Sequence, residues 1–116
     1  MKVKYCKVIA EYRSPFPDPL KIQKSEQVQI VEKESEWPGW IWCINKNGME
    51  GWIPKSYLNI KGRNAILLRD YDATEINAIV GEEFIIEEEE SGWFWVSSKE
   101  GIKGWIPIRN VEVFIK

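Results

Sequence analysis

The chain has 116 residues, of which 44% are hydrophobic, and its 16 Lys and Arg residues nearly balance 18 Asp and Glu residues, giving a formal net charge of −2. This composition is typical of a soluble globular protein, and it excludes an intrinsically disordered chain and a protein built of apolar membrane spans. Residues 1–7 carry positive charge with no apolar segment behind them, so we expect no secretory signal and a cytoplasmic protein.

Histidine is absent, which excludes the usual general base, the commonest zinc ligand and any Ser-His-Asp or Cys-His catalytic arrangement. Cys6 and Cys43 are the two cysteines, too distant in sequence for a Cys-x-x-Cys redox pair and too few for a zinc cluster. We therefore expect two free thiols, no metal and no cofactor. An enzyme is the least favoured function class.

Aromatic and β-branched residues recur along the whole chain between Gly and Pro, and no long window has helical periodicity. In chain order, the predicted strands include residues 28–31, 41–44, 83–86 and 94–97. The Asn/Gly cluster at 45–48 predicts a hairpin turn, and residues 98–101 predict its counterpart. The fold class is therefore all-β, with no helix expected beyond a 3₁₀ turn at 55–57 and another at 108–110.

The chain also repeats itself. Gly51-Trp52-Ile53-Pro54 recurs as Gly104-Trp105-Ile106-Pro107, and Gly39-Trp40-Ile41-Trp42 recurs at the same spacing as Gly92-Trp93-Phe94-Trp95. Strands this short bury a core only by closing on themselves, because a small open sheet leaves two exposed edges. The sequence therefore predicts two small tandem five-stranded β-barrels, residues 1–60 and 61–116.

These motifs resemble, twice and in the same order, those of the Src-homology-3 family, small five-stranded β-barrels that bind proline-rich peptides without catalysis. Residues 8–12 and 67–71 are similar to the family's opening Ala-Leu-Tyr-Asp-Tyr pattern. Residues 51–58 and 104–111 are similar to its closing Gly-Leu-Phe-Pro-Ser-Asn-Tyr-Val pattern. The resemblance implies a tandem protein of a prokaryotic-type variant that acts as a peptide-binding adaptor.

The resemblance also implies a ligand groove paved by aromatic side chains and proline, because flat aromatic faces bind the rings of an extended polyproline II segment. The matching residues of the first repeat are Tyr12, Trp40, Pro54 and Tyr57. Those of the second repeat are Tyr71, Trp93 and Pro107. Ala10 replaces one Tyr in the first repeat, whereas Arg69 and Asn110 replace two in the second, so we expect the first groove to bind peptide and the second to be eroded.

Acidic residues beside the groove contact an Arg or Lys of the ligand in this family, which implies a basic ligand here. The candidates in the first repeat are Asp18, Glu34 and Glu36. The second repeat offers Glu75 and the Glu run at 87–90. A solvated strand edge that discourages aggregation is an equally good interpretation of the Glu run.

The other Trp residues favour different interpretations. Trp37 lies in a loop extension that the second repeat lacks, and both ligand contact and packing stay open for it. The remaining four alternate with apolar residues and are predicted to pack in a core or between repeats. They are Trp42, Trp52, Trp95 and Trp105.

Two alternatives compete with peptide binding. One is a structural or self-associating module with degenerate grooves. The other is nucleic-acid binding, which exposed aromatic side chains on small barrels can serve, but a pI of 5.3 and the lack of a basic cluster beyond residues 1–7 disfavour it. We expect a protein or peptide partner, and neither a membrane nor a nucleic acid.

Overall fold

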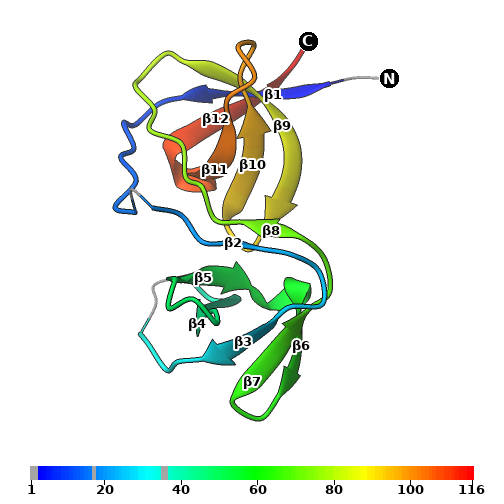
Figure 1. The fold of residues 1–116 in the computed structure, drawn as a ribbon. Coiled ribbons are helices and arrows are strands. Elements are labelled where there is room, and N and C mark those ends of the chain that lie inside the picture. Colours follow the sequence, from blue (N-terminus) through cyan, green and yellow to red (C-terminus); the bar gives the residue numbers. More distant parts are fainter. Residues whose placement is uncertain (1–2, 17, 35–36) are drawn as a thin grey trace. The chain divides into compact units, whose positions relative to one another are not determined.

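A computed structural model describes residues 3–16, 18–34 and 37–116 (Figure 1). These residues form short strands and two 3₁₀ turns, η1 (Lys55–Tyr57) and η2 (Ile108–Asn110), and no α-helix occurs among them. The all-β class and the positions of both turns are therefore confirmed. The chain divides into two compact units, unit 1 (Met1–Pro17 and Thr74–Lys116) and unit 2 (Asp18–Ala73), and each is described by itself.

Unit 1 contains a five-stranded antiparallel sheet in the order β11-β10-β9-β1-β12 (Figure 1). Its strands are β1 (Lys4–Val8), β9 (Glu83–Glu90), β10 (Trp93–Ser97), β11 (Lys103–Pro107) and β12 (Val111–Ile115). In the middle of β1, Cys6 lies opposite Phe84 of β9 on one side and Val113 of β12 on the other. The apolar side chains of these strands bury a common core, which supplies the main driving force for folding. The core consists of Cys6, Val8, Ile76, Ala78, Phe84, Phe94, Val96, Ile106 and Val111.

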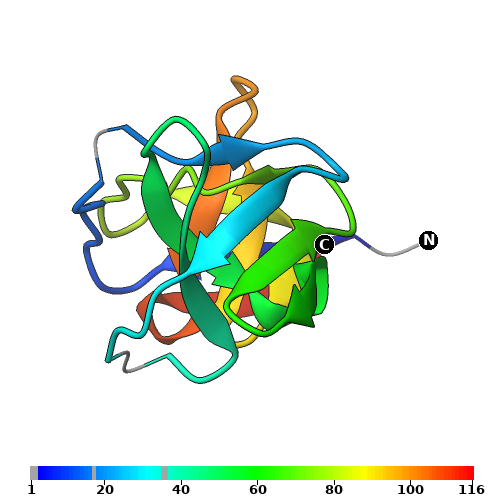
Figure 2. The same cartoon turned by 60° about the horizontal axis from the view of Figure 1, so that its bottom comes forward.

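Unit 2 contains a second five-stranded antiparallel sheet, in the order β5-β4-β3-β7-β6, and a short two-stranded sheet of β2 and β8 (Figures 1 and 2). Its strands are β2 (Lys21–Ile22), β3 (Gln27–Ile30), β4 (Trp40–Ile44), β5 (Glu50–Pro54), β6 (Leu58–Lys61), β7 (Asn64–Leu67) and β8 (Tyr71–Asp72). β7 lies between β3 and β6, with Ala65 opposite Val28 and Leu67 opposite Leu58. The side chains of Val28, Leu58, Ala65 and Leu67 are all buried, which fixes the register of this strand.

The first strand of each sequence repeat pairs outside its own repeat. β1 comes from the first repeat, but its neighbours β9 and β12 come from the second. Conversely, β7 comes from the second repeat, and its neighbours β3 and β6 come from the first. The two compact units therefore differ from the predicted barrels 1–60 and 61–116: unit 2 is one continuous segment, and unit 1 is assembled from two.

The segments that follow these opening strands are exchanged in the same way. Tyr12 forms a bridge with Ala78 in unit 1, while β2 pairs with β8 in unit 2. Leu20 and Ile76 occupy matching places, since each lies against a buried glycine. A Cβ atom added to Gly51 would lie 3.0 Å from Leu20, and one added to Gly104 would lie 2.9 Å from Ile76. The contact at Gly104 is closer than real Cβ atoms come, and the contact at Gly51 is tighter than most, so both crossing segments approach their sheets closely at a glycine.

The predicted hairpin turn between β4 and β5 is confirmed. The backbone N–H of Asn45 donates to the carbonyl of Met49 at 2.9 Å. The Asn45 side-chain oxygen accepts from the backbone N–H groups of Asn47 and Met49, both at 2.9 Å. Gly48 has φ +80°, a conformation that glycine adopts without steric cost. Local sequence therefore determines this turn.

Candidate functional site

An aromatic face runs along β4 and β5 of unit 2. Trp40 lies directly opposite Pro54, and Trp42 lies directly opposite Trp52. Because residues two apart in a strand point to the same side, these four side chains share one face of the two strands. The rings of Trp42 and Trp52 meet edge to face, with 5.0 Å between their centroids.

Two tyrosines extend this face. The Tyr71 hydroxyl donates a hydrogen bond to the Trp52 carbonyl at 2.7 Å, and the Tyr71 ring lies 5.3 Å from the Tyr57 ring in an edge-to-face contact. The guanidinium of Arg69 lies 4.4 Å from the centroid of the Tyr57 ring. Tyr57 and Tyr71 are each only 5% exposed, so the half-buried Trp40 and Trp52 offer more accessible aromatic surface.

An open hollow of about 600 Å³ lies beside Trp40. It is lined by Ile30, Val31, Glu32, Lys33, Glu34, Trp40, Ile41 and Trp42. The Lys33 ammonium lies 3.6 Å from the centroid of the Trp42 ring, a cation–π contact, and the Trp42 indole N–H donates to Glu50 at 3.0 Å. The hollow thus combines an aromatic wall with charges of both signs.

Unit 1 has a matching face with different polar groups. Trp93 lies opposite Pro107, and Trp95 lies opposite Trp105. The Tyr12 ring meets the Trp93 ring edge to face at 5.6 Å. Where unit 2 has Tyr57, unit 1 has Asn110, whose side-chain amide donates to the carbonyls of Ala10 and Glu11 at 3.1 and 3.2 Å.

A carboxylate also distinguishes the unit 1 face. The Tyr12 hydroxyl donates a hydrogen bond to the side chain of Glu75. Burial raises the pKa of Glu75 above its ordinary value of 4.5, although the hydrogen bond from Tyr12 opposes the rise. The matching residue of unit 2 is Pro19, because Pro19 precedes Leu20 as Glu75 precedes Ile76. Only the unit 1 face therefore has an acidic side chain at this position.

The structure groups the predicted site residues by unit rather than by repeat. Unit 1 contains Tyr12, Trp93 and Pro107, whereas unit 2 contains Asp18, Glu34, Trp37, Trp40, Pro54, Tyr57 and Tyr71. The groove predicted from Tyr12 together with Trp40, Pro54 and Tyr57 is thus not found within either unit; Tyr12 and Tyr71 have exchanged places. Glu36 lies outside the described residues.

The predicted acids and Trp37 have different surroundings. Glu34 lines the hollow beside Trp40, and Asp18 is exposed one residue before Pro19. Trp37 is half-buried, and its carbonyl accepts a hydrogen bond from the Trp40 backbone N–H at 3.4 Å. These positions support Glu34 as a neighbour of the aromatic face more directly than Asp18.

Sequence reasoning missed four members of the two faces. Trp42 and Trp52 continue the unit 2 face, and Trp95 and Trp105 continue the unit 1 face. Their alternation with apolar residues predicts packing, and Trp42 and Trp105 are indeed buried, at 7% and 3% exposed. The same alternation also indicates a place on the aromatic face, because residues two apart in a strand point to one side and Trp42 therefore lies on the side of Trp40.

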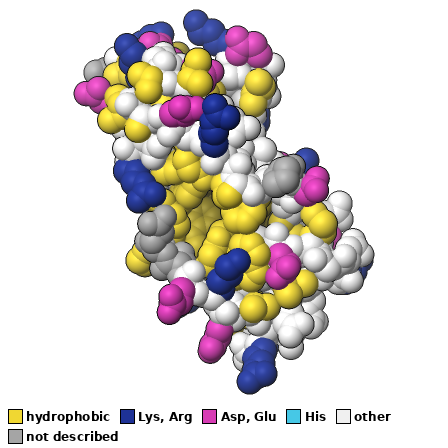
Figure 3. All heavy atoms as spheres, turned by 90° about the vertical axis from the view of Figure 1, so that its left-hand side faces the viewer, with side chains coloured by type: hydrophobic (Ala, Val, Ile, Leu, Met, Phe, Trp, Pro, Cys, Tyr) yellow, Lys and Arg dark blue, Asp and Glu magenta, His cyan; other side chains and the backbone are white. Residues whose placement is uncertain are grey.

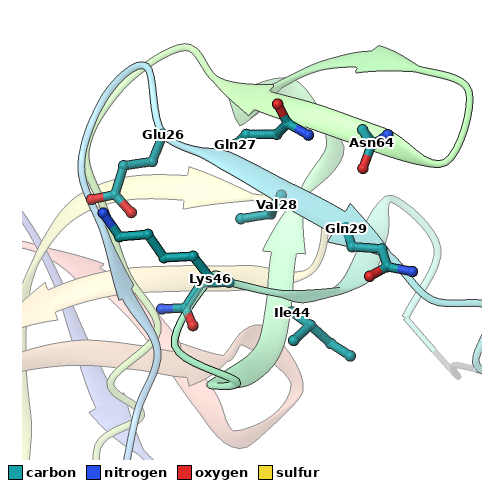
Figure 4. A pocket seen from close by; sticks show the side chains of 8 residues that line it. Glu26, Gln27, Val28, Gln29, Ile44, Lys46 and Asn64 are labelled. Atoms are coloured by element: carbon teal, nitrogen blue, oxygen red, sulfur yellow. The ribbon is translucent and has the colours of Figure 1, made fainter.

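Other features of the described surface do not extend these faces. A second open hollow in unit 2, of about 380 Å³, is lined mainly by polar residue types and contains no aromatic side chain (Figure 4). It is lined by Glu26, Gln27, Val28, Gln29, Ile44, Asn45, Lys46 and Asn64. Figure 3 shows apolar side chains at the surface, among scattered Lys, Arg, Asp and Glu side chains.

The two thiols are buried and free. Burial raises the pKa of Cys6 to about 11 and that of Cys43 to about 12, so both are protonated at neutral pH and pack as small apolar groups. In the described part of the chain, no cluster of three or more His, Cys, Asp or Glu side chains could hold a metal ion. Nor is any helix there long and apolar enough to cross a membrane.

Comparison with known proteins finds similarity over about the first half of the chain. Residues 5–61 match the profile of the variant SH3 domain. The protein nervous wreck of Drosophila melanogaster is 35% identical over 60 residues, which is 52% of this chain and 6% of that protein. Myosin-1 of Schizosaccharomyces pombe is 45% identical over 48 residues, or 41% of this chain and 4% of the myosin. The chain thus corresponds to a small part of each relative, and no solved structure matches it significantly.

The matched range coincides with neither structural unit. Residues 5–61 begin in β1, which pairs in unit 1, and end in β6 of unit 2. The match therefore contains four strands of the unit 2 sheet but not β7. A second such domain in the later repeat stays a prediction. The sequence match thus covers one variant SH3 domain, at residues 5–61 of this chain.

Proposed function

We propose that this chain is a non-catalytic interaction module that binds a short, extended, proline-rich segment of another protein on the aromatic face of unit 2. The observation that carries the proposal is the pairing of Trp40 with Pro54 beside the Trp42–Trp52 pair, next to an open hollow. Flat rings of this kind bind proline rings at low entropic cost, because a polyproline II segment is already extended. SH3 domains in general serve as protein-interaction modules, which supports the same class.

The unit 1 face is the better candidate for a basic ligand residue. Glu75 lies within hydrogen-bonding distance of Tyr12, which in turn contacts Trp93. A ligand Arg or Lys at this position would replace the Tyr12 hydroxyl as the partner of the carboxylate. The resulting ion pair is partly screened and contributes about 1 kcal/mol at most.

Peptide titration of the full chain tests the proposal. We expect proline-rich peptides to bind with affinity on the order of micromolar, since such a shallow surface contacts only a few ligand residues. Trp40→Ala should abolish binding to unit 2, whereas Ile60→Ala, which truncates an exposed apolar side chain of β6 outside the aromatic face, should leave it intact. No binding of any member of a proline-rich peptide library would contradict the proposal.

A structural or self-associating module is the second candidate, because much of the aromatic surface is buried. Trp93 is 7% exposed, and Tyr57 and Tyr71 are each 5% exposed. Sedimentation equilibrium of the full chain distinguishes the two functions. Concentration-dependent association that Trp40→Ala abolishes, together with the absence of peptide binding, would favour the second candidate.

A further inference from the structure

Strand β12 forms one edge of the unit 1 sheet. Among the residues that the structure describes, it pairs with β1 and with no other strand. The backbone of an edge strand presents N–H and C=O groups that a further strand can bind. The opposite edge of the sheet differs, because β11 bridges to Glu75 and the Trp105 N–H donates to the Thr74 carbonyl at 2.8 Å. In the described part of the chain, β12 therefore offers an unpaired backbone edge.

The direction of the backbone groups along β12 follows from its ladder with β1. The carbonyl of Asn110 accepts a backbone hydrogen bond at 2.8 Å from the residue that follows β1, so Asn110 faces that strand. Backbone groups alternate in direction along an antiparallel strand, and Glu112 and Phe114 consequently face β1 as well. The N–H and C=O groups of Val113 and Ile115 therefore point away from β1, toward the open edge.

The same two residues carry exposed apolar side chains. Val113 is 45% exposed and Ile115 is 54% exposed. Val113 lies opposite the core residue Cys6, so both side chains lie on the core side of the sheet, but outside the buried core. A strand added at this edge would cover both side chains and remove apolar surface from water.

The sequence of β12 is complementary to a second copy of itself. In a two-fold antiparallel pair centred on Phe114, Val113 of one copy lies opposite Ile115 of the other, so their outward-facing backbone groups meet. The same register places Glu112 opposite Lys116, which carries the opposite charge. A pair centred on Val113 or on Ile115 would instead set one of these charges opposite Phe114. Only the register centred on Phe114 satisfies the backbone and the charges together.

The Lys116 side chain lies on the side of the strand that this register requires. Its ammonium is 4.8 Å from the centroid of the Tyr5 ring and 5.7 Å from that of Phe114, and these two rings stack. Glu112 points to the same side, because it lies two residues from Phe114. The ion pair of Lys116 with Glu83 spans 3.5 Å between side chains that are 53% and 42% exposed, so it is weak and leaves room for a second carboxylate.

We propose that β12 pairs antiparallel with β12 of a second copy of this chain, centred on Phe114, and joins the two unit 1 sheets into a symmetric dimer. The contact is smaller than a standard protein interface, so its dissociation constant should be on the order of 100 µM. The dimer uses no residue of unit 2. It is therefore distinct from peptide binding and from self-association through Trp40.

Sedimentation equilibrium of the full chain, from micromolar to millimolar concentration, tests the proposal by charge exchange. Glu112→Lys and Lys116→Glu each place like charges opposite each other in a dimer of identical copies. Each should weaken the dimer about tenfold, because both symmetric charge pairs are lost. An equimolar mixture of the two variants places opposite charges across the strands again and should restore association.

Lys99→Glu is the matched control, because it makes the same charge change at an exposed position in the turn between β10 and β11. It should leave the dimer intact, as should Trp40→Ala. Ile115→Lys is a second disruptive variant. It alters an exposed side chain rather than the core, and it should abolish association by placing a charge against Val113 of the second copy. Circular dichroism checks that each variant is folded.

Amide hydrogen exchange gives a second readout at single residues. The N–H groups of Val113 and Ile115 should exchange more slowly as the protein concentration rises, and rates that do not change would overturn the proposal. A chain that stays monomeric at millimolar concentration would also overturn it, as would an equimolar mixture that fails to restore association. Association that Trp40→Ala abolishes would assign the contact to unit 2 instead.

Discussion

Unit 2 is one continuous stretch of chain, whereas unit 1 is assembled from the two ends of the protein. Both nonetheless place five strands in the same spatial order, with an opening strand between the strands that match β3 and β6. In unit 2 that strand is β7, the last of the five sheet strands along the chain. In unit 1 it is β1, the first of the five. One sheet architecture is therefore built in two chain orders, and unit 2 interrupts unit 1 between its first strand and the remaining four.

The comparison predicts its largest effect for fragments of the chain. A fragment of residues 18–73 contains every strand of unit 2 and should fold alone. A fragment of residues 1–60 contains β1 but lacks β7, so β3 and β6 lose their shared neighbour and expose unpaired edges. Far-ultraviolet circular dichroism with thermal melting should show a cooperative transition for the first fragment and none for the second. The opposite result would contradict the division into units.

Core truncations in the two opening strands should weaken opposite units. Leu67 of β7 is 1% exposed, and Leu67→Ala should cost about 2–5 kcal/mol of the stability of unit 2. The matched change Val8→Ala in β1 should instead weaken unit 1, because Val8 belongs to its core. Residue-resolved amide hydrogen exchange measures the two units separately. Faster exchange in β9 and β12 after Leu67→Ala would be incompatible with this pairing.

The two buried glycines, Gly51 of unit 2 and Gly104 of unit 1, differ in how tightly they are packed. An added Cβ at Gly104 would lie 2.9 Å from Ile76 and 3.0 Å from the Thr74 carbonyl, which is backbone. At Gly51 the nearest atoms all belong to the Leu20 side chain, the closest at 3.0 Å. Overpacking of this kind costs about 1–3 kcal/mol, and we expect Gly104→Ala near the upper end and Gly51→Ala near the lower. Urea denaturation checks the order, and a larger loss for Gly51→Ala would refute it.

The smallest expected effect is a pH dependence confined to unit 1. The folded-state pKa of Glu75 is raised, so this group's contribution to stability is full below its ordinary value of 4.5 and is lost as pH rises through the folded value. Glu75→Gln keeps an oxygen for the Tyr12 hydroxyl but cannot ionise. The melting temperature of this variant relative to the wild type should therefore rise between pH 4 and pH 7. A constant difference would show that Glu75 ionises as readily in the folded protein as in the unfolded chain.

Local features of the fold were predictable from the sequence. The Asn45–Gly48 turn and both 3₁₀ turns follow from short-range chemistry, namely side-chain acceptors, a glycine with positive φ and the residues after Pro54 and Pro107. The repeated Trp motifs likewise identified Trp40 and Trp93 as members of the two aromatic faces.

Strand pairing between the repeats was not predictable in the same way. β1 and β7 both alternate buried and exposed residues, so either strand fits either sheet by pattern alone. The pairing depends on where the segments that contain Leu20 and Ile76 cross the two sheets, and these crossings involve contacts between residues far apart in sequence. Because of this pairing, the Tyr12 ring contacts Trp93 and the Tyr71 ring contacts Tyr57. The residues that make up each candidate site therefore differ from the sets predicted for the two repeats.

The most direct test of this exchange is the pattern of nuclear Overhauser effects between backbone protons of neighbouring strands in the full chain. The exchanged arrangement predicts contacts from β1 to β9 and β12, with Cys6 close to Phe84 and to Val113, and contacts from β7 to β3 and β6. Contacts from β1 to β3 and β6, with β7 beside β9 and β12, would contradict it and would restore barrels that follow the two sequence repeats.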